Sequence, residues 1–124
     1  MDSTGIRPAA SDDARAVQAI YAHYVTTSVA TFEETVPAVD EMARRIDDAR
    51  VAGLPFLVAC RPATGELIGF GYCTVYRARS AYWCTVEDSV YVHPDARGQG
   101  AGRLLLGELL DACSQAGIRQ VVAV

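Results

Sequence analysis

The stretch VYVHPDARGQGAGRLLL, Val90–Leu106, decides the fold of this chain. It begins as a β-type run and ends as a helical one, with glycines at alternate positions between them, Gly98, Gly100 and Gly102. One glycine would suffice for a turn. Several in this register indicate that something outside the protein comes close to the backbone where a helix begins.

Three known glycine patterns place backbone against phosphate, and two of them do not fit. The P-loop requires a lysine, and all 11 basic residues of this chain are arginine. The dinucleotide fingerprint needs a glycine where Arg103 stands, and an acidic residue about 20 positions later, which the run from Ile118 to Val124 lacks. The third pattern, Arg-x-x-Gly-x-Gly, is met by Arg97, Gly100 and Gly102. An ordinary glycine-rich turn is the alternative.

The third pattern has a physical reason. The first turn of a helix carries unpaired N–H groups and a partial positive charge of about half a unit. Glycines omit the Cβ atoms that would keep a diphosphate from those groups, and arginines add charged hydrogen bonds. The predicted diphosphate site comprises Arg97, Gly98, Gln99, Gly100, Ala101, Gly102 and Arg103.

Hydrophobic periodicity and breaker residues predict the remaining elements. We expect a helix over 12–27 with Ser11 in its cap, a loop over 28–36, and a helix opened by Pro37 and ended by Gly53. Strands are expected at Gly5–Pro8, Pro55–Cys60, Leu67–Tyr76, Tyr82–Val92 and Ile118–Val124, and a helix from the glycine loop to a cap at Gly117. The order β-α-α-β-β-β-α-β predicts an α/β (α+β) fold with a mixed central sheet flanked by helices.

Length and composition limit the function. A chain of 124 residues with 51% hydrophobic content suits one domain, residues 1–124. Its net charge of −4 and lack of a long apolar run argue against nucleic-acid and membrane partners. The cysteines at 60, 73, 84 and 113 lack C-x-x-C spacing, and there are only two histidines. This favours free thiols in the cytoplasm and no metal site.

Beyond these patterns, the loop Arg97–Gly102 resembles the acetyl-CoA loop of the GNAT N-acetyltransferases. The resemblance is to the phosphinothricin (methionine sulfoximine) acetyltransferase branch, and rests on residues 6–9, 20–24, 26–28, 32, 77–79, 81–82, 85–92 and 121–124. It implies the GNAT fold, with acetyl-CoA as co-substrate and a small amino-acid-like amine as acceptor. It further implies that the backbone of Val90, Tyr91 and Val92 pairs with the pantetheine arm.

Glu87 is the candidate general base, because amines are mostly protonated at neutral pH. Strand alternation places it on one face with Thr85, Ser89 and Tyr91, although a bulge of the kind the family has on this strand would break that parity locally. A carboxylate among apolar neighbours tends to have a raised pKa, which suits a base. From the residues alone, a structural ion pair with an arginine is an equal alternative; the resemblance implies the catalytic role.

The acceptor residues rest mainly on the resemblance. Arg77 and Arg79 would clamp a carboxylate or phosphinate of the substrate, and Phe32 and Tyr82 would line the pocket. The alternatives are solvated arginines, and aromatic residues that serve the core or a dimer contact. A protein N-terminus or an aminoglycoside is a weaker choice of acceptor.

The family's domain continues past the position of Val124, with a further helix and two strands. We therefore expect a fragment truncated at its C-terminus, with an uncovered sheet edge that favours self-association, and a homodimer. A non-catalytic CoA-binding module, or an inactive fragment of such an enzyme, is the alternative function.

Overall fold

The computed structural model describes residues 5–27, 35–75, 85–98, 100–115 and 120–123. In chain order its elements are β1 (Gly5–Pro8), η1 (Ser11–Asp13), α1 (Ala14–Thr27), α2 (Val39–Ala52), β2 (Phe56–Cys60), β3 (Leu67–Val75), β4 (Thr85–Val92), η3 (Pro94–Ala96), α3 (Ala101–Gln115) and β5 (Gln120–Ala123). This confirms the predicted order of helices and strands. Several residues of the expected elements, including most of the expected loop over 28–36, lie outside the described residues: 28–34, 76, 82–84, 116–119 and 124.

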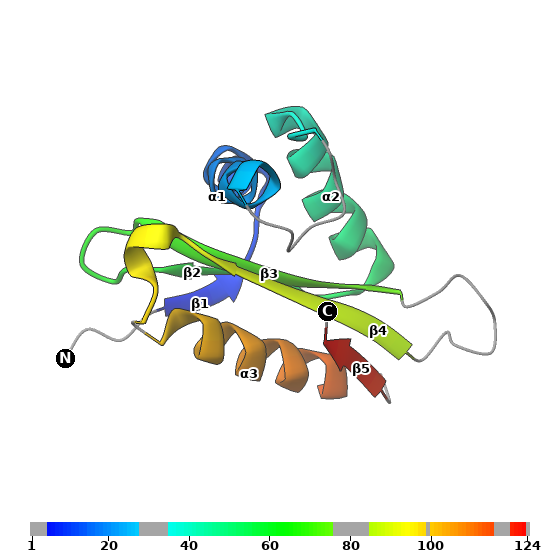
Figure 1. The fold of residues 1–124 in the computed structure, drawn as a ribbon. Helices are drawn as coiled ribbons and strands as arrows, with labels where there is room; N and C mark the ends of the chain where they lie inside the picture. The colour runs from blue at the N-terminus through cyan, green and yellow to red at the C-terminus, as the bar shows by residue number, and fades with distance from the viewer. Residues whose placement is uncertain (1–4, 28–34, 76–84, 99, 116–119, 124) are drawn as a thin grey trace.

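The strands form one sheet in the order β1-β2-β3-β4-β5. Neighbours from β1 to β4 are antiparallel, whereas β4 and β5 are parallel. A parallel pair needs a crossover, and α3 supplies it from the opposite face to α1 and α2 (Figure 1). The mixed, helix-flanked sheet predicted from the sequence is therefore confirmed.

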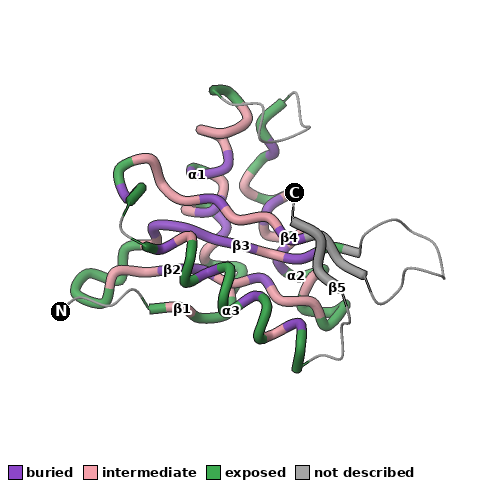
Figure 2. The backbone as a smooth tube through the Cα atoms, turned by 60° about the horizontal axis from the view of Figure 1, so that its bottom comes forward, coloured by how far each residue is buried: buried purple, intermediate pink, exposed green. Residues whose placement is uncertain are grey.

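The core lies on both faces of the sheet, and β3 runs buried through its middle (Figure 2). On the face of α1 and α2, Phe70 packs with Val17 and Ile20. On the face of α3, Leu105 packs with Ile68 and Ala59. Each helix thus buries one apolar stripe and leaves its other side to water.

The helix α3 lies close against β3, at Gly69 and Gly71. A Cβ atom at Gly71 would stand 2.8 Å from Cδ1 of Leu109, which is itself fully buried. At Gly69 it would stand 3.1 Å from the carbonyl oxygen of Tyr91. These glycines let a helix approach the strand more closely than a side chain would permit.

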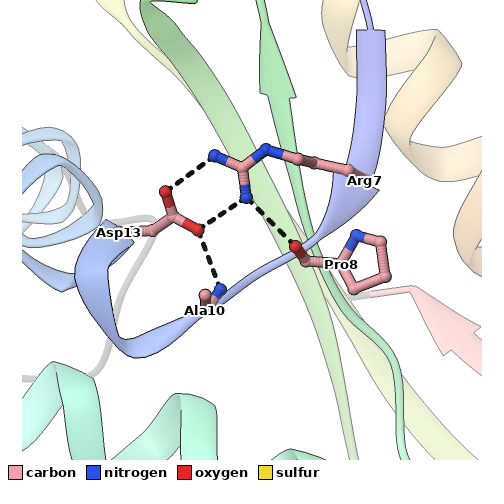
Figure 3. Close-up of polar contacts among 4 residues, drawn as sticks. All are labelled: Arg7, Pro8, Ala10 and Asp13. Carbon is pink, nitrogen blue, oxygen red and sulfur yellow. Dashed lines mark hydrogen bonds and ion pairs between the residues drawn. The ribbon is translucent and has the colours of Figure 1, made fainter.

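The start of the first helix differs from the prediction. Ser11–Asp13 forms the short turn η1, α1 begins at Ala14, and Ala10 rather than Ser11 occupies the cap position. The Asp13 carboxylate accepts a 2.8 Å hydrogen bond from the Ala10 N–H and a two-pronged contact from the Arg7 guanidinium (Figure 3). The Arg7 contact is the main reason that the pKa of Asp13 lies below its ordinary value. This local network replaces the expected serine cap and ties β1 to η1, the turn that leads into α1.

The second helix also begins later than expected. Ala38 is its cap residue, so Pro37 precedes the helix rather than opening its first turn. The carbonyl of Pro37 accepts a 3.1 Å hydrogen bond from Gln18 of α1 instead. The predicted end is confirmed, because Gly53 adopts a left-handed conformation and its N–H bonds back to Ala49 and Arg50.

Of the predicted free thiols, Cys60, Cys73 and Cys113 are free, and Cys84 lies outside the described residues. Cys73 and Cys113 are buried with their sulfurs 3.4 Å apart, and burial raises the pKa of both thiols. Within the described ranges, no group of three or more His, Cys, Asp or Glu side chains could hold a metal ion. No helix in that part of the chain has the length and apolar character to cross a membrane.

Candidate cofactor site

The outer edge of β4 carries the first half of the site. The N–H of His93 donates to the carbonyl of Ile68 on β3 at 2.7 Å. Hydrogen-bonding direction alternates along an antiparallel strand. The backbone groups of Val90 and Val92 therefore face away from β3, toward the β5 side.

The described pairing with β5 involves the first half of β4. Described pairs between the two strands run from Thr85↔Gln120 to Asp88↔Ala123. Val90 and Val92 lie beyond the last of these pairs, at the end of β4 that leads into η3 (Figure 1). The N–H and C=O groups of Val90 and the N–H of Val92 can pair with an extended ligand as another strand would.

The side chains of β4 alternate as the sequence predicts. Tyr91 packs edge-on against Tyr21 of α1, with ring centroids 5.3 Å apart, whereas Val90 and Val92 join the cluster beneath α3. The register with β3 is continuous from Val86 to Val92. The bulge that the family resemblance allowed does not occur in this pairing.

The loop after β4 is the second half of the site. The turn η3 begins beside His93, whose Nδ1 accepts a 3.0 Å hydrogen bond from the N–H of Asp95. Gly98 and Gly100 follow with φ values of +82° and +85°. Side chains rarely adopt this left-handed backbone, so both glycines are required for the path of the chain into α3.

The first turn of α3 faces an open cavity. The earliest described helical bond there runs from the Leu104 N–H to the Gly100 carbonyl, 3.1 Å, so the amides of Ala101, Gly102 and Arg103 have no acceptor within the helix. These amides border a cavity of about 540 Å³. It is lined by Val92, Ala96, Arg97, Gly98, Gly100, Ala101, Gly102 and Arg103.

Charge in this cavity is positive. Arg97 and Arg103 are both exposed at its walls, and the N-terminal end of the α3 dipole adds to their field. A cavity with arginines and the first amides of a helix suits a diphosphate. The structure thus brings together every residue of the predicted loop site except Gln99, which lies outside the described residues.

One residue of this neighbourhood was not predicted as part of the site. Tyr24, on the last turn of α1, donates a 2.6 Å hydrogen bond to the carbonyl of Val92 and accepts a 3.2 Å hydrogen bond from Arg97. In the sequence it reads only as one member of an apolar helical stripe. A contact between residues this far apart along the chain leaves no local pattern.

The predicted catalytic and acceptor residues are described only in part. The backbone of Glu87 lies opposite Thr74 on β3 and Val122 on β5, but its side chain is not among those the structure describes. Phe32, Arg77, Arg79 and Tyr82 all lie outside the described residues. The roles of these residues remain predictions.

The neighbour of Glu87 is an unexpected buried acid. Asp88 is 4% exposed and is the one buried charged residue found in the described ranges. Burial raises the pKa of its carboxyl, in part offset by a hydrogen bond from its own amide. The strand therefore buries an acid on the α3 face.

The fold and the loop before α3 indicate a domain of the GNAT acetyltransferase class, and comparison with known proteins supports that class. Residues 17–124 match the model of the acetyltransferase (GNAT) family. The chain belongs to that family. The predicted GNAT fold is confirmed.

Particular relatives lie in the predicted branch. The chain is 50% identical over 118 residues to phosphinothricin N-acetyltransferase of Alcaligenes faecalis, covering 95% of this chain and 59% of that protein. It is 32% identical over 118 residues to the L-methionine sulfoximine/L-methionine sulfone acetyltransferase of Salmonella typhimurium, covering 95% of this chain and 68% of that protein. The chain thus spans well under two thirds of the length of the first relative.

A solved structure shows the same arrangement. The phosphinothricin acetyltransferase of Sinorhizobium meliloti, determined in complex with AcCoA, aligns with a TM-score of 0.93 and 42% identity. The alignment covers 98% of this chain and 65% of that one. The predicted likeness to the phosphinothricin and methionine sulfoximine acetyltransferases is therefore confirmed.

Proposed function

We propose that the chain is the acetyl-CoA-binding part of an N-acetyltransferase. The acceptor would be the amine of a small amino-acid-like compound of the phosphinothricin or methionine sulfoximine type. The observation that carries this proposal is the continuity of the site, because the open edge at Val90 and Val92 leads directly into the amides of Ala101–Arg103. An extended arm that ends in a diphosphate matches that continuity.

The reaction follows from the shape of the ligand. With the diphosphate held at α3, the pantetheine arm would run back along β4 and place the thioester near the middle of the strand. The amine nitrogen attacks the thioester carbonyl carbon, the carbon–sulfur bond breaks, and the thiolate leaves as the CoA thiol once it gains a proton. The acceptor ammonium must first lose a proton.

Glu87 is the proposed base for that proton, directly or through a water molecule. Its position on β4 supports the proposal, because it precedes Val90 by three residues and shares the parity of Tyr91. Arg77 and Arg79 would hold the acceptor's acid group, with Phe32 and Tyr82 beside it. Names of the relatives support this acceptor class.

The experiment uses the intact protein with acetyl-CoA and with phosphinothricin or methionine sulfoximine, and follows release of the CoA thiol. The Glu87→Gln variant should lower kcat by roughly a hundredfold or more, with acetyl-CoA binding retained. Glu108→Gln is the matched control, since Glu108 is exposed on α3 away from the strand. Turnover that survives Glu87→Gln unchanged would remove this residue from the mechanism.

A second candidate is a non-catalytic CoA-binding module. The described cavity at the start of α3 would serve such a module without the proposed base or acceptor residues. Binding of acetyl-CoA without turnover of any amine in a broad panel would support the module. A homodimer and a cytoplasmic location also remain predictions, for which sedimentation and cell fractionation are the direct measurements.

A further inference from the structure

Tyr24 joins the two ends of the turn η3. Its hydroxyl donates to the carbonyl of Val92, at the end of β4, with an oxygen–oxygen distance of 2.6 Å. The same hydroxyl accepts from Nη2 of Arg97, just after η3, at 3.2 Å. One side chain of α1 thus contacts both halves of the cofactor site.

The two hydrogen bonds have a fixed direction. A carbonyl oxygen can only accept, so the tyrosine proton points at Val92 and the oxygen lone pairs remain for Arg97. Bonds linked in this way polarise and strengthen one another. The guanidinium carbon of Arg97 also lies 5.5 Å from the centre of the Tyr24 ring, within reach of a cation–π attraction.

The tyrosine itself is firmly placed. Its ring packs against Tyr91 with centroids 5.3 Å apart and edge-on against His23 at 5.1 Å. The hydroxyl is therefore presented from a packed helix rather than from a loop. Its contacts restrict the exposed Arg97 side chain at the wall of the cavity.

We propose that Tyr24 is a positioning residue for the diphosphate half of the coenzyme. By using one donor of the Arg97 guanidinium, it fixes the side chain and leaves the other donors for an anion. A tethered arginine loses less rotational freedom on binding than a free one does. The inference rests on the proposed function and assigns within it a role that does not involve contact with the ligand.

The test compares two ligands in the intact protein. CoA contains the diphosphate, whereas pantetheine ends before it, and NMR titration measures both dissociation constants. Tyr24→Phe keeps the ring contacts and removes only the hydroxyl. We expect it to weaken CoA binding roughly tenfold and to leave pantetheine binding within about twofold. A purely structural role would weaken both ligands alike.

A double-mutant comparison gives the control. Tyr24→Phe combined with Arg97→Gln should weaken CoA binding by little more than Arg97→Gln alone, because the tyrosine acts through that arginine. Combined with Arg103→Gln, the two losses should multiply, because in the described part of the chain Tyr24 contacts Arg97 and not Arg103. Arg103 thus serves as a matched arginine from the same cavity.

The outcomes separate the inference from the proposed function. An equal loss for CoA and pantetheine, no loss for CoA, or losses that multiply with Arg97→Gln would each overturn the role of Tyr24 while leaving the cofactor site intact. Wild-type protein that binds pantetheine and CoA equally, or neither, would overturn the diphosphate site and the inference with it. A selective loss for CoA that vanishes in the Arg97→Gln background supports it.

Discussion

Two glycine pairs of identical spacing, one in β3 and one in the loop before α3, meet opposite physical needs. Gly69 and Gly71 stand where a Cβ atom would press on α3 and β4. Gly98 and Gly100 have nothing within 4 Å of such an atom, but their φ values are positive. The first pair is required by crowding and the second by backbone conformation.

The difference separates stability from binding. Crowded glycines let α3 pack closely on the sheet, which contributes to the free energy of folding. The glycines with positive φ set the direction of the amides at the start of α3, which contributes to the cofactor site. Substitution by alanine should therefore affect different measurements in the two regions, although the sequence motif Gly-x-Gly is the same in both.

The largest effect on stability is expected for Gly71→Ala. Its methyl group would meet Leu109 Cδ1 at 2.8 Å and Ser89 and Val90 at 3.2 Å, and Leu109 is fully buried. Overpacking of this kind costs about 2 kcal/mol of unfolding free energy. Urea denaturation measures the loss. Variant protein as stable as wild type would show that α3 can shift away from β3.

A smaller stability loss, with a larger effect on binding, is expected for Gly100→Ala. Alanine in a left-handed conformation costs about 1 kcal/mol, and relief of that strain would turn the amides of α3 away from the cavity. CoA affinity should fall by roughly tenfold or more, because one or two hydrogen bonds from these amides to the charged diphosphate would be lost. Calorimetry on folded variant measures it. Unchanged affinity would mean that the loop conformation does not set the site.

How far the sequence predicts these regions depends on the range of the interactions. Gly53 ends a helix as expected, because the signal and its effect are neighbours in the chain. For the loop glycines, the sequence analysis gave one physical reason, which is the removal of Cβ atoms near a diphosphate. The structure adds a second reason, because Gly98 and Gly100 have positive φ values.

Interactions between distant elements were beyond sequence reasoning. The crowding at Gly71 depends on where Leu109 falls when α3 packs, and the contact of Tyr24 with Val92 depends on how α1 crosses the sheet. The boundary at Pro37 was wrong for a related reason. A proline suits the first turn of a helix, but here its carbonyl bonds to Gln18 of another helix.

A glycine that is neither crowded nor held at a positive φ sharpens the comparison between the two glycine pairs. Gly107 lies within α3, is exposed, and would have nothing within 4 Å of an added Cβ atom. Alanine there removes the entropic cost of glycine in a helix and should stabilise the protein by about 0.5 kcal/mol. Thermal unfolding with and without CoA provides the measurement. A loss of stability would point to a contact on this face of α3.

The central claim is that backbone amides at the start of α3, together with the open edge of β4, bind the coenzyme. Amide-resolved NMR of the intact protein during titration with CoA tests it most directly. The account predicts the largest shifts at Ala101, Gly102 and Arg103, with smaller ones at Val90 and Val92. Shifts confined to residues away from β4 and the first turn of α3, or none at saturating CoA, would contradict it.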